Sequence, residues 1–85
     1  MHFSDLPRVF KEQPLWGAEE DGFSFIISYE RGLGYRASVK PIGAVPFDGK
    51  INFIGEHYRR FGAAMWACEQ WLKERRNVLH NRTGT

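Results

Sequence analysis

The chain has 85 residues, which is enough for one domain and too few for two. Its composition, 42% hydrophobic and 26% charged, is that of a globular protein, and no run of 18 apolar residues predicts a membrane-spanning helix. The single cysteine, Cys68, excludes an intramolecular disulfide and favours a reducing compartment, so we expect a cytoplasmic protein with no membrane partner.

The formal net charge of +2 is unevenly distributed along the chain. Residues 1–49 carry five basic and seven acidic side chains, whereas residues 50–85 carry seven basic and three acidic ones. The basic excess falls on the C-terminal helix predicted below and on its flanks. It either attracts phosphate or an acidic protein surface, or simply keeps the helix solvated.

The N-terminal segment is predicted to hold a short helix and a loop. Residues 3–12 favour the helix because Phe3, Leu6 and Phe10 fall near one helical face, and a proline follows them. Residues 15–22 are predicted as a loop. Its acidic residues are expected to form a solvated tip, which consists of Glu19, Glu20 and Asp21.

Residues 23–30 and 35–40 are predicted to form a β-hairpin, because apolar and polar side chains alternate in both. Two glycines in the stretch 31–34 allow the tight turn between them. The side chains expected to face the core are Phe23, Phe25, Ile27, Tyr29, Tyr35, Ala37 and Val39.

A third strand is predicted at residues 51–54, after a proline-broken connection at 41–50. Alternation places Ile51 and Phe53 toward the core, and Gly55 ends the strand.

A long amphipathic helix is predicted from the region of Tyr58 to Phe61 as far as about Arg76. Its core-facing side chains are Phe61, Met65, Cys68 and Leu72, with Ala64 and Trp71 beside them. Trp66 lies off this track. If it is exposed, it suits stacking on a base or anchoring in a protein pocket, and the alternative is that the small core reaches round to cover it.

These elements predict a two-layer α+β domain in the order α-β-β-β-α, in which the C-terminal helix covers a three-stranded antiparallel sheet. We expect a single domain over residues 1–85, with an N-terminal segment at 1–22, the sheet and helix at 23–76, and a flexible tail at 78–85.

The opposite face of the sheet is expected to be exposed, and its polar side chains are Ser24, Ser28, Glu30, Arg36, Ser38, Lys40 and Asn52. Ile26 and Ile54 also point outward in this arrangement. They either mark a contact surface or pack under the N-terminal segment.

The sequence shows no constellation of catalytic or metal-binding residues. Cys68 lies on the apolar stripe of the helix, where a buried thiol is inert. Glu56 and His57 are adjacent, but no third group supports acid–base chemistry, so a structural role before the helix is favoured. The histidines are too scattered for a zinc site, at positions His2, His57 and His80. We therefore predict a protein that is not an enzyme and has no cofactor or metal ion.

Three strands followed by the helical stretch 58–74 resemble the three-stranded domains of AP2-type DNA-binding domains and of the N-terminus of tyrosine integrases. The resemblance covers about residues 23–76, and the matching residues are Phe61, Ala64, Trp71 and Leu72. In that family the exposed sheet face enters the DNA major groove, so the resemblance implies that Arg36, Lys40 and Asn52 hold the reading positions. This chain departs from the pattern in lacking a Ser or Thr cap before its helix.

The leading interpretation is a small non-enzymatic binding protein that docks on a protein or nucleoprotein partner. At the level of size and class, the chain is similar to small phage and mobile-element inhibitors such as anti-CRISPR proteins. The alternative is DNA binding through the exposed sheet face, although a net charge of +2 is low for a dedicated DNA-binding domain. The residues expected to bind the partner are Arg36, Lys40 and Asn52 on the sheet and Arg59, Arg60, Trp66 and Lys73 on the helix flank. Pairing of an edge strand within residues 41–54 predicts a homodimer as a further arrangement.

Overall fold

The computed structural model describes residues 1–6, 13–43 and 52–83, with side chains as far as Asn77. In chain order its elements are β1 (Ser4–Asp5), β2 (Leu15–Glu20), β3 (Phe23–Glu30), β4 (Gly34–Pro41), β5 (Asn52–Tyr58) and α1 (Phe61–Thr83). The predicted α+β class, with an antiparallel sheet and one C-terminal helix, is confirmed. The predicted number of three strands is wrong, because the sheet has five.

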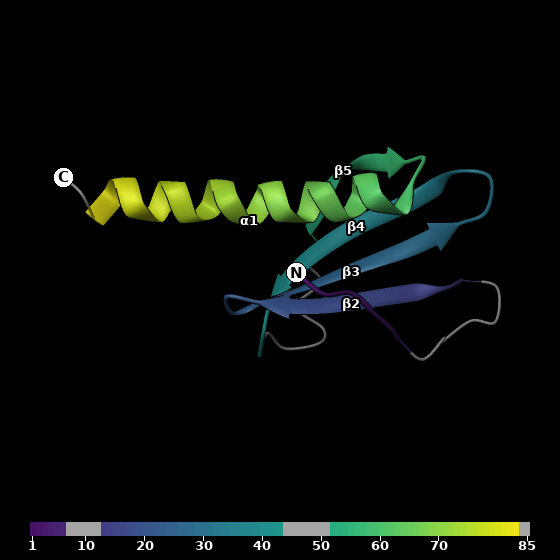
Figure 1. Ribbon diagram of the computed structural model, residues 1–85, viewed down its shortest axis with the longest axis horizontal. Coiled ribbons are helices and arrows are strands. Elements are labelled where there is room, and N and C mark those ends of the chain that lie inside the picture. The colour runs from purple at the N-terminus through teal and green to yellow at the C-terminus, as the bar shows by residue number, and fades with distance from the viewer. Residues whose placement is uncertain (7–12, 44–51, 84–85) are drawn as a thin grey trace.

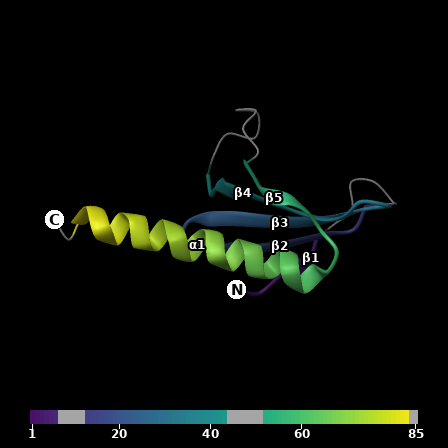
Figure 2. The same cartoon turned by 90° about the horizontal axis from the view of Figure 1, so that it is seen from above.

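The sheet is a meander in which each strand pairs antiparallel with the next one in sequence, in the order β1-β2-β3-β4-β5. Helix α1 lies along one side of it, and its C-terminal turns extend past the end of the sheet (Figure 1). Figure 2 shows the same arrangement from above, with α1 on one face only. The opposite face has no helical cover in the described part of the chain.

The N-terminal segment differs from the expectation. Residues 4–5, which were expected to be helical, form strand β1 and pair with β2. Residues 7–12 of the expected helix lie outside the described residues. The expected loop at 15–22 is instead strand β2. Trp16 and Ala18 alternate on it and face Ile27 and Phe25 across the ladder, so these side chains gain cover from the helix layer.

The connection from β2 to β3 is a two-residue turn at Asp21 and Gly22, both with positive φ, of 52° and 82°. Two positive φ values in succession characterise the type I′ hairpin, for which Asp-Gly is a favoured sequence. The acidic residues therefore lie at a hairpin corner.

The hairpin of β3 and β4 is confirmed, with β3 at the expected bounds and β4 one residue longer at each end. Its inward side chains Phe25, Ile27, Ala37 and Val39 are buried. They pack against the inward face of α1, which consists of Ala64, Cys68 and Leu72. The rings of Phe23 and Phe25 meet the Trp71 ring edge-on, with centroids 5.1 and 5.7 Å away.

Strand β5 reverses the predicted faces of the third strand. Ile54 pairs with Ala37 and packs on the core, whereas Phe53 pairs with Ser38 and is 52% exposed. The strand also continues beyond Gly55 to Tyr58, through a bulge in which residues 55–57 oppose a single residue of β4. The bulge is possible because Gly55 takes a φ of +66°. The outward position predicted for Ile54 and the inward one for Phe53 are therefore wrong.

Helix α1 begins at Phe61, within the predicted starting region of Tyr58 to Phe61, and continues past the predicted end at Arg76 to Thr83. Residues 78–83, expected to be part of a flexible tail, are the last turns of this helix, and residues 84–85 lie outside the described residues.

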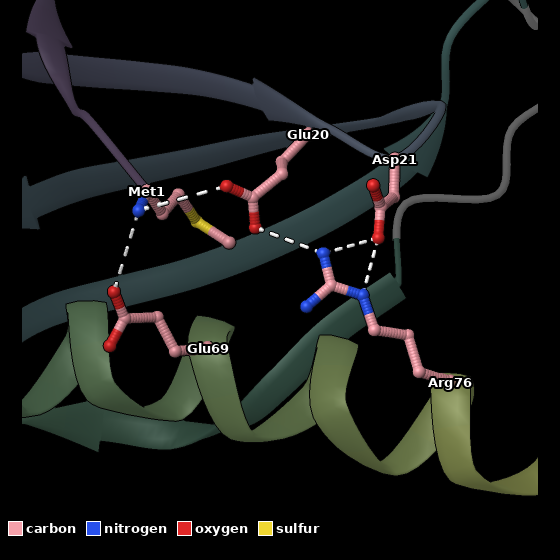
Figure 3. A network of polar contacts seen from close by, with 5 residues as sticks. All are labelled: Met1, Glu20, Asp21, Glu69 and Arg76. Atoms are coloured by element: carbon pink, nitrogen blue, oxygen red, sulfur yellow. Dashed lines mark hydrogen bonds and ion pairs between the residues drawn. The ribbon is translucent and has the colours of Figure 1, made fainter.

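The acidic corner of the β2–β3 hairpin is tied to the helix by Arg76. Its guanidinium lies 3.5 Å from the Glu20 carboxylate and also binds Asp21 (Figure 3). The α-amino group of Met1 lies 3.7 Å from the carboxylates of Glu20 and Glu69. The predicted solvated tip is thus partly used in an ion-pair network.

Replacing Arg76 with alanine is expected to lower the free energy of unfolding by only about 0.2–1 kcal/mol, because the paired side chains are about half exposed. The loss should shrink at high salt, which screens such pairs. Urea unfolding at low and high salt measures it, with Lys73→Ala as the control at an exposed helix position. An equal loss at both salt concentrations would argue against an ionic origin.

Candidate functional site

The sheet face opposite α1 has no helix on it among the described residues (Figure 2). On β3 and β4 it carries Ser24, Ile26, Ser28, Glu30, Arg36, Ser38 and Lys40, since their neighbours in sequence face the helix. Near β2 this face is occupied by Leu6, whose Cδ1 lies 2.8 Å from the place of a Cβ on Gly17. Ile26 is partly buried in that region, so packing under the N-terminal segment explains it.

A hollow of about 500 Å³ opens at the other side of this face. Its lining residues include Gly32, Leu33, Arg36, Phe53, Glu56 and His57. They come from the β3–β4 turn, from β4 and from the bulged part of β5. Leu33 is 61% exposed and Phe53 is 52% exposed, so the hollow has two apolar side chains open to solvent.

Glu30 organises the polar groups beside this hollow. His57 Nε2 lies 2.7 Å from Glu30 Oε2, and Arg36 Nη1 lies 3.5 Å from Glu30 Oε1. The Arg36 guanidinium carbon in turn lies 4.3 Å from the centroid of the Phe53 ring, a cation–π geometry. One carboxylate therefore holds two side chains and, through Arg36, braces an exposed aromatic ring.

Three more arginines lie at the same end of the sheet, and we call them the cationic rim: Arg31, Arg59 and Arg60. Arg31 is in the β3–β4 turn, and Arg59 and Arg60 connect β5 to α1. Arg59 Cα lies 3.9 Å from the place of a Cβ on Gly34, which brings the connection against the turn. Within the described residues, none of the three forms an ion pair within 4.0 Å.

The predicted sheet-face residues do not form one group. Arg36 lines the hollow, and Lys40 lies on the same face but four residues, about 13 Å, along the strand. Asn52 pairs with Val39, which faces the helix, and together with Lys40 it lines a separate depression beside Trp71. Arg36 therefore lies at the hollow on the face opposite α1, and Asn52 lies on the other face.

The predicted helix-flank residues also lie on two separate surfaces. Trp66 is 60% exposed, which settles its position in favour of exposure. Lys73 is exposed seven residues later, on the same helical face. Arg59 and Arg60 precede the helix and belong to the end of the sheet that holds the hollow. Trp66 and Lys73 thus form a second surface, apart from the hollow.

Among the described residues that line the hollow, only Arg36 was predicted as a site residue. The side chains that were missed are Leu33, Phe53, Glu56 and His57. Phe53 was assigned to the core because the alternation was counted from Ile51, which lies outside the described residues, whereas Ile54 is the residue that packs on the core. For His57 the missed signal is Gly55, since an isolated glycine within a strand indicates a bulge. His57 gains its partner Glu30 only through this bulge, at a sequence separation of 27.

Cys68 is buried in the core, as predicted. Burial raises the pKa of its thiol to about 12, and the charge of Glu69 adds to this rise. The thiolate is therefore strongly disfavoured in the folded chain.

We expect Cys68 to resist alkylation by iodoacetamide in the folded protein and to react once urea unfolds it, because the thiolate is the nucleophile.

The unfolded thiol, with a pKa near 9.0, loses its proton before the folded one does. The free energy of unfolding should therefore fall as pH rises from about 9 to about 12. A Cys68→Ala variant should lack this part of the pH dependence. Alkylation of Cys68 at equal rates in the folded and the unfolded protein would contradict the inertness of the buried thiol.

Two further properties concern only the described part of the chain. It contains no group of three or more His, Cys, Asp or Glu side chains placed to hold a metal ion. None of its helices has the length and apolar character needed to cross a membrane.

Comparison of the chain with protein-family models, with curated proteins and with solved structures found no match.

Proposed function

We propose that this chain is a non-enzymatic binding protein that docks on a protein or nucleoprotein partner through the hollow on its uncovered sheet face. The observation that supports this most directly is the exposure of Leu33 and Phe53 at one depression. A domain of this size has few large apolar side chains beyond those its core needs. Two of them placed together in solvent are typical of an interaction surface.

The arrangement of charge supports the same site. The hairpin corner of β2 and β3 has its carboxylates Glu20 and Asp21 paired with Arg76. The cationic rim, by contrast, has no such partners among the described residues. A basic surface of this kind attracts an acidic partner and speeds its association.

DNA binding through the sheet is the second candidate, because Arg36 and Lys40 do share the uncovered face. Two features argue for a protein or nucleoprotein partner instead. Arg36 is already held by Glu30, and Asn52 lies on the helix side. Inhibition of a bacterial defence system, suggested by size and class, stays a prediction.

Capture of partners from a host lysate, with and without nuclease, tests the proposal. Immobilised wild-type chain is expected to capture a specific protein, and a Phe53→Ser variant is expected to lose it. Trp66→Ser is the matched control, since it removes an equally exposed aromatic side chain from the other surface. Capture that depends on Trp66 and not on Phe53 would overturn the assignment to the sheet face. Capture that disappears with nuclease and weakens steeply with salt would favour DNA.

The predicted homodimer would use β5, which lies at the edge of the sheet. Its bulge at residues 55–57 interrupts the regular row of backbone groups that a second strand would need. We therefore expect a monomer in sedimentation velocity at low micromolar concentration. A dimer whose population rises with protein concentration in sedimentation would contradict this expectation.

A further inference from the structure

We propose that the hollow receives an aromatic or leucine side chain from an acidic peptide segment of the partner, with the cationic rim binding the carboxylates on either side of it. This rests on the proposed docking function and specifies its chemistry. It commits to a protein segment as the occupant, and nucleic acid is an outcome of the test.

The floor of the hollow is suited to one apolar side chain. The hollow, of about 500 Å³, is an open depression in the surface and not an enclosed cavity. Leu33 and Phe53 supply apolar surface from two separate elements, the β3–β4 turn and β5. The Phe53 ring is held in place by the Arg36 guanidinium, so little side-chain freedom is lost on binding.

The surroundings of the hollow are suited to carboxylates. The end of the sheet carries four arginines, of which only Arg36 has a carboxylate partner among the described residues. Its acidic side chains there are Glu30, which is shared between Arg36 and His57, and Glu56. An apolar centre with a charged periphery is the usual anatomy of a protein interface, in which the rim sets orientation and partner choice.

The same details disfavour a nucleic acid in the hollow. Glu56 lines it and Glu30 lies beside it, so phosphate and carboxylate are both disfavoured inside the hollow and the anionic groups of a partner are left to the cationic rim. One face of the Phe53 ring is occupied by Arg36, which limits stacking of a base. Leu33 is 61% exposed, and its aliphatic side chain offers a phosphate neither a positive charge nor a hydrogen-bond donor.

Selection from a library of random twelve-residue peptides displayed on phage tests the inference directly. The wild-type chain is the target, and the Phe53→Ser variant removes peptides that bind elsewhere. We expect the enriched peptides to share an aromatic or leucine residue flanked by Asp or Glu. Enrichment of basic peptides, or of peptides that bind both proteins equally, would overturn the inference.

The best enriched peptide, labelled with fluorescein, then allows affinities to be compared by polarisation. We expect Phe53→Ser and Leu33→Ser each to weaken binding at least about tenfold, as central interface residues do. The double change Arg31→Glu/Arg59→Glu should weaken it most at low salt. Trp66→Ser should leave the affinity unchanged, and circular dichroism checks that each variant is folded.

A labelled oligonucleotide of twenty thymidines distinguishes the two classes of occupant. If it binds more tightly than the peptide and its binding needs Phe53, the occupant is nucleic acid and the inference is wrong. If no peptide is selected while lysate capture still depends on Phe53, the inference fails and the proposed function stands. If neither peptide binding nor lysate capture depends on Phe53, the inference and the proposed function both fail.

Discussion

Replacing Phe25 with alanine is expected to remove most of the stability of this domain, at a cost of about 3–5 kcal/mol. Phe25 has no exposed surface, lies in the middle strand of the sheet, and meets Trp71 edge-on at 5.7 Å. The loss combines the transfer of a phenyl ring to water with the cavity left under α1. A domain of 85 residues has a total stability on the order of 5–10 kcal/mol, so the variant should be partly unfolded at 37 °C. Urea unfolding followed by circular dichroism measures the change.

Phe53→Ala is the matched control for this prediction, because it removes the same side chain from the same sheet. Phe53 is 52% exposed and contacts solvent where Phe25 contacts the helix. Its replacement should cost no more than about 1 kcal/mol, most of it from the lost stacking of Arg36. Equal losses at Phe25 and Phe53 would mean that β5 is turned over relative to β4.

Gly34→Ala is expected to destabilise the domain by roughly 3 kcal/mol. Gly34 has a φ of +108°, which is unfavourable for any residue with a Cβ. That Cβ would also overlap the backbone carbonyl oxygen of Tyr58. Relief requires the end of β5 to move away from β4, and the start of α1 must move with it.

Gly32→Ala separates these two causes. Gly32 lies in the same turn with a φ of +81°, but a Cβ there would meet no atom within 4 Å. Only the backbone strain applies, so the loss should be about 1 kcal/mol. Thermal unfolding of both variants gives the comparison, and a Gly34→Ala variant no less stable than Gly32→Ala would contradict the close approach of Tyr58.

The β3–β4 hairpin could be predicted from the sequence because local pattern and tertiary burial agree there. Phe25, Ile27, Ala37 and Val39 alternate with polar residues, and each is buried. The helix start at Phe61 and the burial of Cys68 were predictable for the same reason, since a single apolar stripe defines both.

Strand β2 was missed because its alternation is weak. Gly17 stands where an outward side chain would be, and the acidic residues near its end suggested a loop. The stronger signal was the dipeptide at 21–22, since Asp-Gly is typical of a type I′ turn and therefore of strands on both sides. A single-sequence pattern also gives no indication that β1 adds to the edge, because two residues carry no period.

The candidate site was predicted only in part. Arg36 was expected on the uncovered face and is found there, because it follows the regular alternation of β4. Phe53 lies in the regular part of β5, on the face opposite to the one predicted. His57 depends on the bulge at residues 55–57, across which Tyr58 donates a hydrogen bond to the Ile54 carbonyl at 3.1 Å. Alternation assigns a residue to a face only while the register is regular.

The meander order of the sheet has a consequence for the folding rate. Every strand pairs with its neighbour in sequence, so no pairing has to wait for a distant part of the chain. We expect the β3–β4 hairpin to form early and the other strands to add on either side of it. Helix α1, last in the chain, then closes the core. Domains with such local topology fold on the order of milliseconds, which leaves the exposed face of the growing sheet little time to aggregate.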